Sequence, residues 1–197
     1  MNINALPHHG TAANGRLRVF SLYVDFPASV CARWANSTIS QLGGPNWITS
    51  AEMWKLDSFA TSTSIRNMIT GEAARADVLL VTVSSLGYRH HELIRWLEAL
   101  ATWPTNGQST GLLIGMFGDN DNHNSELNWT VEQCLNCAGR MNRDFIWRWM
   151  ETSAMSDYSL LKENLEPFLA CKLTMTEETP LSGLPALSPP RLAARAG

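Results

Sequence analysis

The sequence has no apolar run long enough to cross a membrane and no large excess of charge of either sign. A membrane span needs roughly 18 or more consecutive apolar residues, and the N-terminal residues do not combine the basic and apolar regions of a signal peptide. The formal net charge is only −3, so neither nucleic acid nor a membrane is expected as a partner. We therefore expect a cytoplasmic protein whose four cysteines stay reduced, because disulfides are rare in that compartment.

Both ends of the chain lack the periodic apolar pattern of a packed domain. Residues 1–15 carry Pro7, Gly10 and Gly15 among small and polar residues, and residues 176–197 hold four of the nine prolines. The 197-residue chain is otherwise of ordinary globular composition, with 45% hydrophobic and 17% charged residues. We predict a flexible leader at 1–15, a single α/β domain at 16–175 and a disordered tail at 176–197.

Apolar runs of strand length alternate with segments of helical periodicity through this domain. The run at 76–85, ADVLLVTVSS, is typical of a strand buried on both faces of a parallel sheet. The other expected elements are strands at 17–24, 47–54, 112–117 and 145–150, helices between them, and a last helix at 157–170. Because the third and fourth strands are the most apolar, we predict a three-layer α/β/α sandwich whose mainly parallel five-stranded sheet has the flavodoxin-like order 2-1-3-4-5.

Two further expectations concern the edges of this sheet. The strand at 47–54 is half polar, which suits an edge, and the helix that follows it is expected to bury Ile65, Met68, Ile69 and Ala73. At the other edge, Phe145, Trp147 and Trp149 place three rings on one face at a period of two. This aromatic face suits packing against a partner subunit as easily as packing against a helix of its own chain. A homodimer is therefore an expected assembly.

The winding also predicts where a ligand binds. In open α/β sheets, ligands bind beyond the carboxyl ends of the strands, where the connection reverses. The residues that follow strands one, three and four are Asp25 and Phe26, Ser84, Ser85 and Gly87, and Gly118 and Asp119. A carboxylate, hydroxyls and glycines suit a small polar ligand such as a ribose. The competing interpretation is that Asp25 and the serines only cap helices and loops.

Two known uses of this winding do not fit the residues. Phosphoryl-accepting receiver domains need an aspartate after strand three, where this chain has Ser84. Flavodoxins present a hydroxyl-rich phosphate loop after strand one, where this chain begins with Asp25, whose carboxylate repels phosphate. We therefore predict no flavin cofactor, and no other cofactor is indicated.

One segment resembles two further families. The pair Ala76-Asp77 directly precedes an apolar strand, a loop with hydroxyl residues follows the strand, and Glu92 lies at the start of the next expected helix. This pattern of about twenty residues is similar to Toll/interleukin-receptor-type domains and nucleoside deoxyribosyltransferases. The resemblance implies that Glu92 acts on an N-glycosidic bond, with Asp25 or Ser84 holding the ribose. His90-His91 stands where the receptor-type domains have a Trp-Cys pair, which puts that family in doubt. As a whole, the chain resembles small uncharacterised bacterial α/β proteins of flavodoxin-like or Rossmann-like fold.

The remaining polar and thiol clusters do not have the spacing of metal or redox sites. The loop 119–126 alternates oxygens as a calcium loop does, but its sixth position is Asn124 and its twelfth is Thr130, where glycine and glutamate are required. Cys134 and Cys137 have redox spacing but lie well inside a helix, away from the N-terminus that would activate a thiol. We predict no metal site and interpret both thiols as core residues.

The sequence therefore favours a small-molecule-binding or protein-interaction module with a crevice at the carboxyl ends of strands one and three. The alternative is a nucleotide- or nucleoside-processing enzyme that uses Glu92 with Asp25 or Ser84. The two differ in one geometric respect, because the enzyme requires the Glu92 carboxylate to face the crevice.

Overall fold

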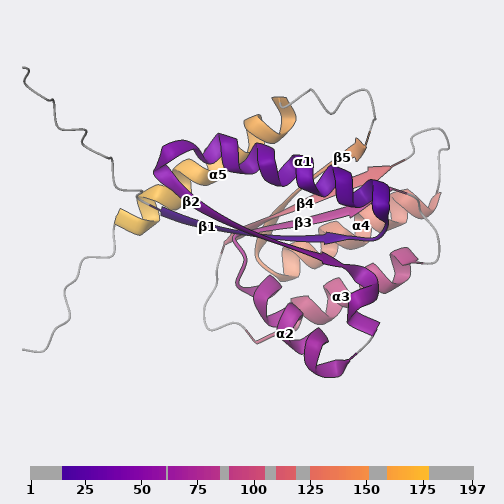
Figure 1. The fold of residues 1–197 in the computed structure, drawn as a ribbon. Coiled ribbons are helices and arrows are strands. Elements are labelled where there is room, and N and C mark those ends of the chain that lie inside the picture. Colours follow the sequence, from indigo (N-terminus) through magenta and orange to yellow (C-terminus); the bar gives the residue numbers. More distant parts are fainter. Residues whose placement is uncertain are drawn as a thin grey trace, which may run out of the picture.

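A computed structural model of the chain describes residues 15–60, 62–84, 89–104, 110–118, 125–150 and 159–177. Within these residues one five-stranded parallel sheet has the order β2-β1-β3-β4-β5 (Figure 1). Its strands are β1 (Gly15–Tyr23), β2 (Trp47–Lys55), β3 (Val78–Val83), β4 (Gly111–Gly118) and β5 (Arg143–Met150). The helices are α1 (Phe26–Gly43), α2 (Thr63–Ala74), α3 (Arg89–Ala101), α4 (Ser125–Arg140) and α5 (Ser159–Glu177), with short 3-10 turns η1 (Gly44–Asn46) and η2 (Leu56–Ala60). The predicted fold class and strand order are confirmed.

Two expected boundaries shift by one or two residues. The strand β1 begins at Gly15, the last residue of the predicted leader, and α5 runs to Glu177, so residues 176 and 177 belong to the helix and not to the predicted tail. The rest of the tail and residues 1–14 lie outside the described residues. No helix in the described part of the chain is long and apolar enough to cross a membrane.

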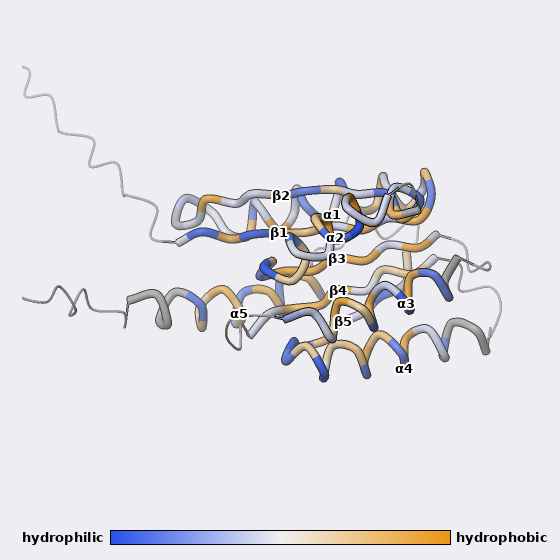
Figure 2. Tube along the Cα trace, turned by 90° about the horizontal axis from the view of Figure 1, so that it is seen from below, coloured by the Kyte–Doolittle hydropathy of each residue, from blue (hydrophilic) through white to orange (hydrophobic). Residues whose placement is uncertain are grey.

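Helices cover both faces of the sheet, as right-handed crossovers require. One apolar core lies between the sheet and α2, α3 and α4, and a second lies between the sheet and α1 and α5, on the opposite side in Figure 1. Figure 2 shows the hydrophobic colouring of the central strand β3. Side chains of each strand alternate between the two cores: in β3, Leu79 and Val81 enter the first, while Val78 and Leu80 enter the second. Every residue of β3 and β4 is buried, which explains why these two strands read as continuous apolar runs.

The helix before β3 buries a different face from the one expected. Ile69 and Ala73 are buried as predicted, but Ile65 is 38% exposed and Met68 is 53% exposed. Thr70 is buried in their place. The prediction of an Ile65 and Met68 stripe is therefore wrong, and these two apolar side chains face outward near the β2 edge of the sheet.

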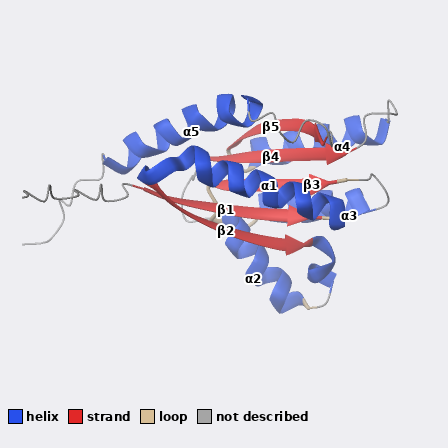
Figure 3. Cartoon of the chain, turned by 45° about the horizontal axis from the view of Figure 1, so that its top comes forward, coloured by secondary structure: helices blue, strands red, loops and turns tan. Residues whose placement is uncertain are grey.

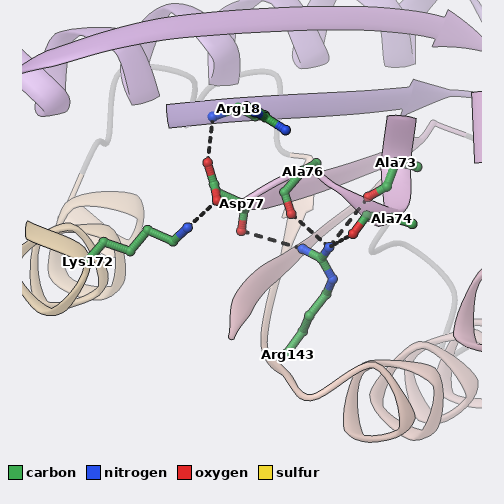
Figure 4. A network of polar contacts seen from close by, with 7 residues as sticks. All are labelled: Arg18, Ala73, Ala74, Ala76, Asp77, Arg143 and Lys172. Atoms are coloured by element: carbon green, nitrogen blue, oxygen red, sulfur yellow. Dashed lines mark hydrogen bonds and ion pairs between the residues drawn. The ribbon is translucent and has the colours of Figure 1, made fainter. Parts of the chain in front are cut away.

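A polar network ties together the amino ends of the strands (Figure 4). Arg143, buried at the start of β5, donates hydrogen bonds to backbone carbonyls of the last turn of α2 and the residues after it, of which Ala76 is the nearest acceptor at 2.8 Å. The carboxylate of Asp77 accepts a hydrogen bond from the backbone N–H of Arg18 at 2.8 Å and pairs with Lys172 of α5. The Ala76-Asp77 pair thus has a structural role: its carbonyl and carboxylate join β1, β3, β5 and two helices.

Candidate functional site

The carboxyl ends of β1, β3 and β4 lie together at one edge of the sheet. Directly after β1, the backbone N–H of Val24 donates a hydrogen bond to the carbonyl of Thr82 in β3 at 3.2 Å. Gly118 ends β4 so close to β3 that a Cβ atom there would lie 2.8 Å from the Cα of Ser84. The structure therefore brings Asp25, Ser84 and Gly118 to the same edge, as parallel winding requires.

Asp25 is the N-cap of α1. Its Oδ1 accepts a hydrogen bond from the backbone N–H of Ala28 at 2.9 Å, which satisfies one free amide of the first helical turn. Pro27, with no N–H of its own, follows in that turn. Among the described residues the second carboxylate oxygen, Oδ2, is buried and has no hydrogen-bond partner. The capping interpretation of Asp25 is thus correct for one oxygen and leaves the other available.

The structure describes three of the remaining predicted crevice residues, which are Phe26, Ser84 and Gly118. The Phe26 side chain is 76% exposed at the start of α1, so it points into solvent. Ser84 is half-buried. Ser85, Gly87 and Asp119, together with most of the polar loop 119–126, lie outside the described residues.

Glu92 lies in a different place from the other candidates. It lines a cavity of about 270 Å³ between η2, α2 and α3, which we call the α2–α3 pocket. The pocket is lined by Leu56, Phe59, Arg66, Asn67, Thr70, Glu92, Arg95, Trp96, Ala99 and Trp103. Asp25 and Ser84 do not line it. The pairing that the nucleoside-processing alternative needs therefore has no support among the described side chains.

The floor of the α2–α3 pocket is held by a chain of hydrogen bonds. Trp96 donates from Nε1 to Thr70 Oγ1 at 3.2 Å, and this hydroxyl donates to the carbonyl of Arg66 at 2.8 Å. Arg66 in turn donates from Nε and Nη2 to the carbonyl of Phe59, at 3.3 and 3.2 Å. The rings of Phe59 and Trp96 pack with centroids 5.3 Å apart. The aromatic floor and one guanidinium are therefore fixed before any ligand binds.

The opening of the pocket carries more positive than negative charge. Arg66 and Arg95 stand on opposite helices, with Glu92 one turn before Arg95 on α3, and all three side chains are exposed. Two guanidiniums and two aromatic rings in one lining suit an anion with a flat apolar body, because arginine pairs with carboxylates in two-point geometry and stacks on rings.

Sequence reasoning missed the two arginines, although a signal for them was present. Glu92, Arg95 and Ala99 follow one another at helical spacing, so they share one face of α3, and Trp103 follows the helix. That face is more polar than the buried stripe beside it, as a solvent-facing surface also is. Which neighbour it faces depends on how α2 packs beside α3, and residue spacing does not contain that information.

The thiols and histidine singled out in the sequence lie in packing positions. Burial raises the pKa of Cys134 to about 12 and also raises that of Cys137, so both remain protonated thiols at neutral pH. His91 packs against Trp129 of α4 with ring centroids 5.0 Å apart. The side chain of His90 is outside the described part of the chain.

Comparisons with known proteins support the fold alone. No protein-family model and no curated protein matches the chain. An oxidoreductase from Corynebacterium diphtheriae is similar at 11% identity and a TM-score of 0.54, over 81% of this chain and 98% of that one. A WrbA-like flavodoxin protein from Agrobacterium tumefaciens has 9% identity and a TM-score of 0.47, over 82% and 98% of the two chains. A short-chain flavodoxin associated with a non-canonical PDU bacterial microcompartment has 10% identity and a TM-score of 0.45, over 81% and 99%.

The residues at the end of β1 do not fit FMN, the cofactor of flavodoxins. Only Val24 and Asp25 separate β1 from α1, so there is no loop to surround a phosphate. The first turn of α1, where a phosphate would bind to free amides, is already capped by the Asp25 carboxylate. A second negative group at this position would be repelled, so the flavodoxin-like fold here does not include the flavodoxin phosphate site.

Proposed function

We propose that the chain is a binding module of flavodoxin-like fold that takes a small organic anion in the α2–α3 pocket. The observation that carries the proposal is that Arg66 of α2 and Arg95 of α3 line the same cavity as the packed Trp96 and Phe59 rings. The cavity of about 270 Å³ is close to the lower end of the usual range for ligand sites, roughly 300 Å³. A ligand of one or two rings with a single carboxylate matches this size and charge.

The crevice at Asp25 and Ser84 is the other position that we propose for a ligand. The buried, unpartnered Oδ2 of Asp25 would accept a hydrogen bond from a hydroxyl or amide of a polar molecule. The two positions require different ligands, since the α2–α3 pocket favours an anion and Asp25 repels one.

A ligand screen with paired variants tests the proposal. Aromatic carboxylates, nucleosides and nucleotides are added to the full chain, and stabilisation is measured by thermal shift and affinity by calorimetry. Arg95→Gln should weaken binding of an aromatic carboxylate roughly tenfold or more, because a charge-assisted hydrogen bond is lost. Arg33→Gln, an exposed arginine of α1 on the opposite face of the sheet, is the matched control and should bind as the wild type does.

Three results would redirect or overturn the proposal. Unchanged affinity in Arg95→Gln would remove the α2–α3 pocket as the site, and loss of binding in Ser84→Ala would favour the crevice. Nucleosides are in the screen because of the sequence resemblance to nucleoside deoxyribosyltransferases. Release of a free base that stops in Glu92→Gln would favour the enzymatic alternative.

A further inference from the structure

The strand β2 forms a long, exposed edge of the sheet. Among the described residues β2 pairs with β1 on one side and with no strand on the other (Figure 3). It has nine residues without a proline, and Ile48 is 56% exposed. Natural proteins shorten, bend or cover edges of this kind, because an open edge readily pairs with another strand.

We infer that two copies of the chain join through β2, in antiparallel pairing about a two-fold axis that passes through Ala51. In this register Ile48 of one copy lies opposite Trp54 of the second copy. Ser50 lies opposite Glu52, and Trp47 lies opposite Lys55. The two five-stranded sheets would become one continuous sheet of both copies, with identical surfaces facing each other as a two-fold axis requires.

The side chains on the α2 side of β2 complement each other in this register. Trp54 packs against the core beneath α2, and Ile48 projects from the same face of the strand because it lies six residues earlier. A shallow groove of about 480 Å³ runs between β2 and α2, lined by Met53, Trp54 and Met68 with Glu52 and Glu72 beside them. Ile48 of the second copy would enter this groove and cover the exposed side chain of Met68.

Charge selects this register among the neighbouring ones. An axis through Glu52 would place two Glu52 carboxylates directly opposite each other, which destabilises a strand pair. An axis through Ser50 would place Ile48 opposite Glu52. A shift of the pairing by a single residue would put Trp54 opposite Thr49, from the other face. Of these registers, the one with the axis through Ala51 pairs Ile48 with Trp54 and leaves Glu52 opposite the hydroxyl of Ser50.

The other edge strand is less suited to this role. In β5, Phe145 packs towards the α2, α3 and α4 core and Ile146 towards the α1 and α5 core. The side chain of Trp147 in the same strand is 39% exposed. Helices therefore cover much of both faces of β5, and the homodimer that the sequence suggested through Phe145, Trp147 and Trp149 is here assigned to β2.

Sedimentation equilibrium of the full chain tests the inference. The wild type should have twice the 21.8 kDa mass of the chain. Ala51→Glu should raise the dimer dissociation constant roughly a hundredfold, because two carboxylates would meet at the axis. Ala51→Lys should act in the same way. A 1:1 mixture of the two variants should recover the dimer, because Ala51 is the position that faces itself.

The recovery in the mixture also shows that both variants fold, since Ala51 is exposed in the single chain. Trp147→Glu is the matched control on the other edge and should leave the mass unchanged. A wild type that sediments as a single chain at every concentration overturns the inference. So does an Ala51→Glu protein that stays dimeric, or a Trp147→Glu protein that becomes monomeric.

Discussion

The amino and carboxyl ends of the sheet each hold an aspartate, and the two differ in how many of their oxygens are used. At the amino end, Asp77 accepts from the backbone of Arg18 with Oδ2 and pairs with Lys172 through Oδ1. At the carboxyl end, Asp25 caps α1 with Oδ1, while among the described residues Oδ2 has no partner. A fully paired aspartate is explained by the fold, whereas a buried unpaired oxygen still needs an explanation. The carboxyl end therefore retains a buried acceptor that the described part of the fold does not use.

The amino-end network should be the more costly of the two to break. Arg143→Met removes the guanidinium that caps the carbonyls at the end of α2, and we expect a loss of about 3–5 kcal/mol in the free energy of unfolding. Burial already lowers the pKa of Arg143, with Asp77 opposing the shift, so the charge depends on these acceptors. Urea denaturation measures the change.

Arg75→Met is the control for this measurement. Arg75 is exposed at the same end of α2 and pairs with Glu72 on the surface, so its loss should cost no more than about 1 kcal/mol. Equal losses in Arg143→Met and Arg75→Met would mean that the buried cap contributes nothing beyond a surface charge.

Two glycines at opposite ends of β4 allow the amino and carboxyl ends of the sheet to be compared by substitution. In Gly118→Ala the new Cβ would lie 2.8 Å from both Cα and the carbonyl carbon of Ser84, so the β3 backbone must move, and we expect a loss of about 3 kcal/mol. In Gly111→Ala the Cβ would lie 2.5 Å from Nη1 of Arg143 and 3.0 Å from the carbonyl oxygen of Asp77. Part of that strain falls on a side chain, so the loss should be nearer 2 kcal/mol.

Thermal unfolding followed by circular dichroism measures both glycine variants. A Gly118→Ala protein as stable as the wild type would show that the carboxyl ends of β3 and β4 can separate easily. Such a result would place the flexible end of the sheet at the predicted crevice and would weaken the argument for a pre-formed site there.

Lys172→Met breaks the amino-end network at a less buried point. Its side chain is 22% exposed and that of Asp77 is 14% exposed, so removing the cation leaves a largely buried carboxylate with one backbone donor. We expect a loss of about 2 kcal/mol. Lys162→Met on the same helix, in an exposed pair with Glu166, should change stability by less than about 0.5 kcal/mol. Urea denaturation of both variants decides whether the Lys172 pair is more than a surface contact.

The sequence predicted the sheet and its order because those depend on local patterns. The apolar run 78–83 could only be a strand covered on both faces, and alternation of strands and helices then left few topologies. Asp25 could be placed at a helix N-terminus, since Pro27 follows in the first turn. Which strand ends meet at the edge of the sheet that holds Asp25 and Ser84 follows from parallel winding alone.

The rest depended on how helices rotate against their neighbours. Met68 was expected in the core, but α2 lies beside the exposed β2 edge and turns Thr70 inward instead. The enzymatic alternative required Glu92 to face Asp25 and Ser84, yet Glu92 lines the α2–α3 pocket with Arg66 and Arg95. Helical spacing states which residues share a face, and only tertiary packing decides what that face contacts.

The smallest expected change concerns the unpaired oxygen of Asp25. Asp25→Ala removes the cap and should cost about 1 kcal/mol. Asp25→Asn keeps an acceptor for the N–H of Ala28 and replaces the buried, unpartnered oxygen with an uncharged group, so its stability should lie within about 0.5 kcal/mol of the wild type. Chemical denaturation compares the three proteins. If Asp25→Asn is as destabilised as Asp25→Ala, Oδ2 already has a partner within the folded chain, and it is then no longer available to a ligand. If Asp25→Asn keeps its stability but loses the thermal shift caused by a polar ligand, the oxygen belongs to the site and the crevice is where that ligand binds.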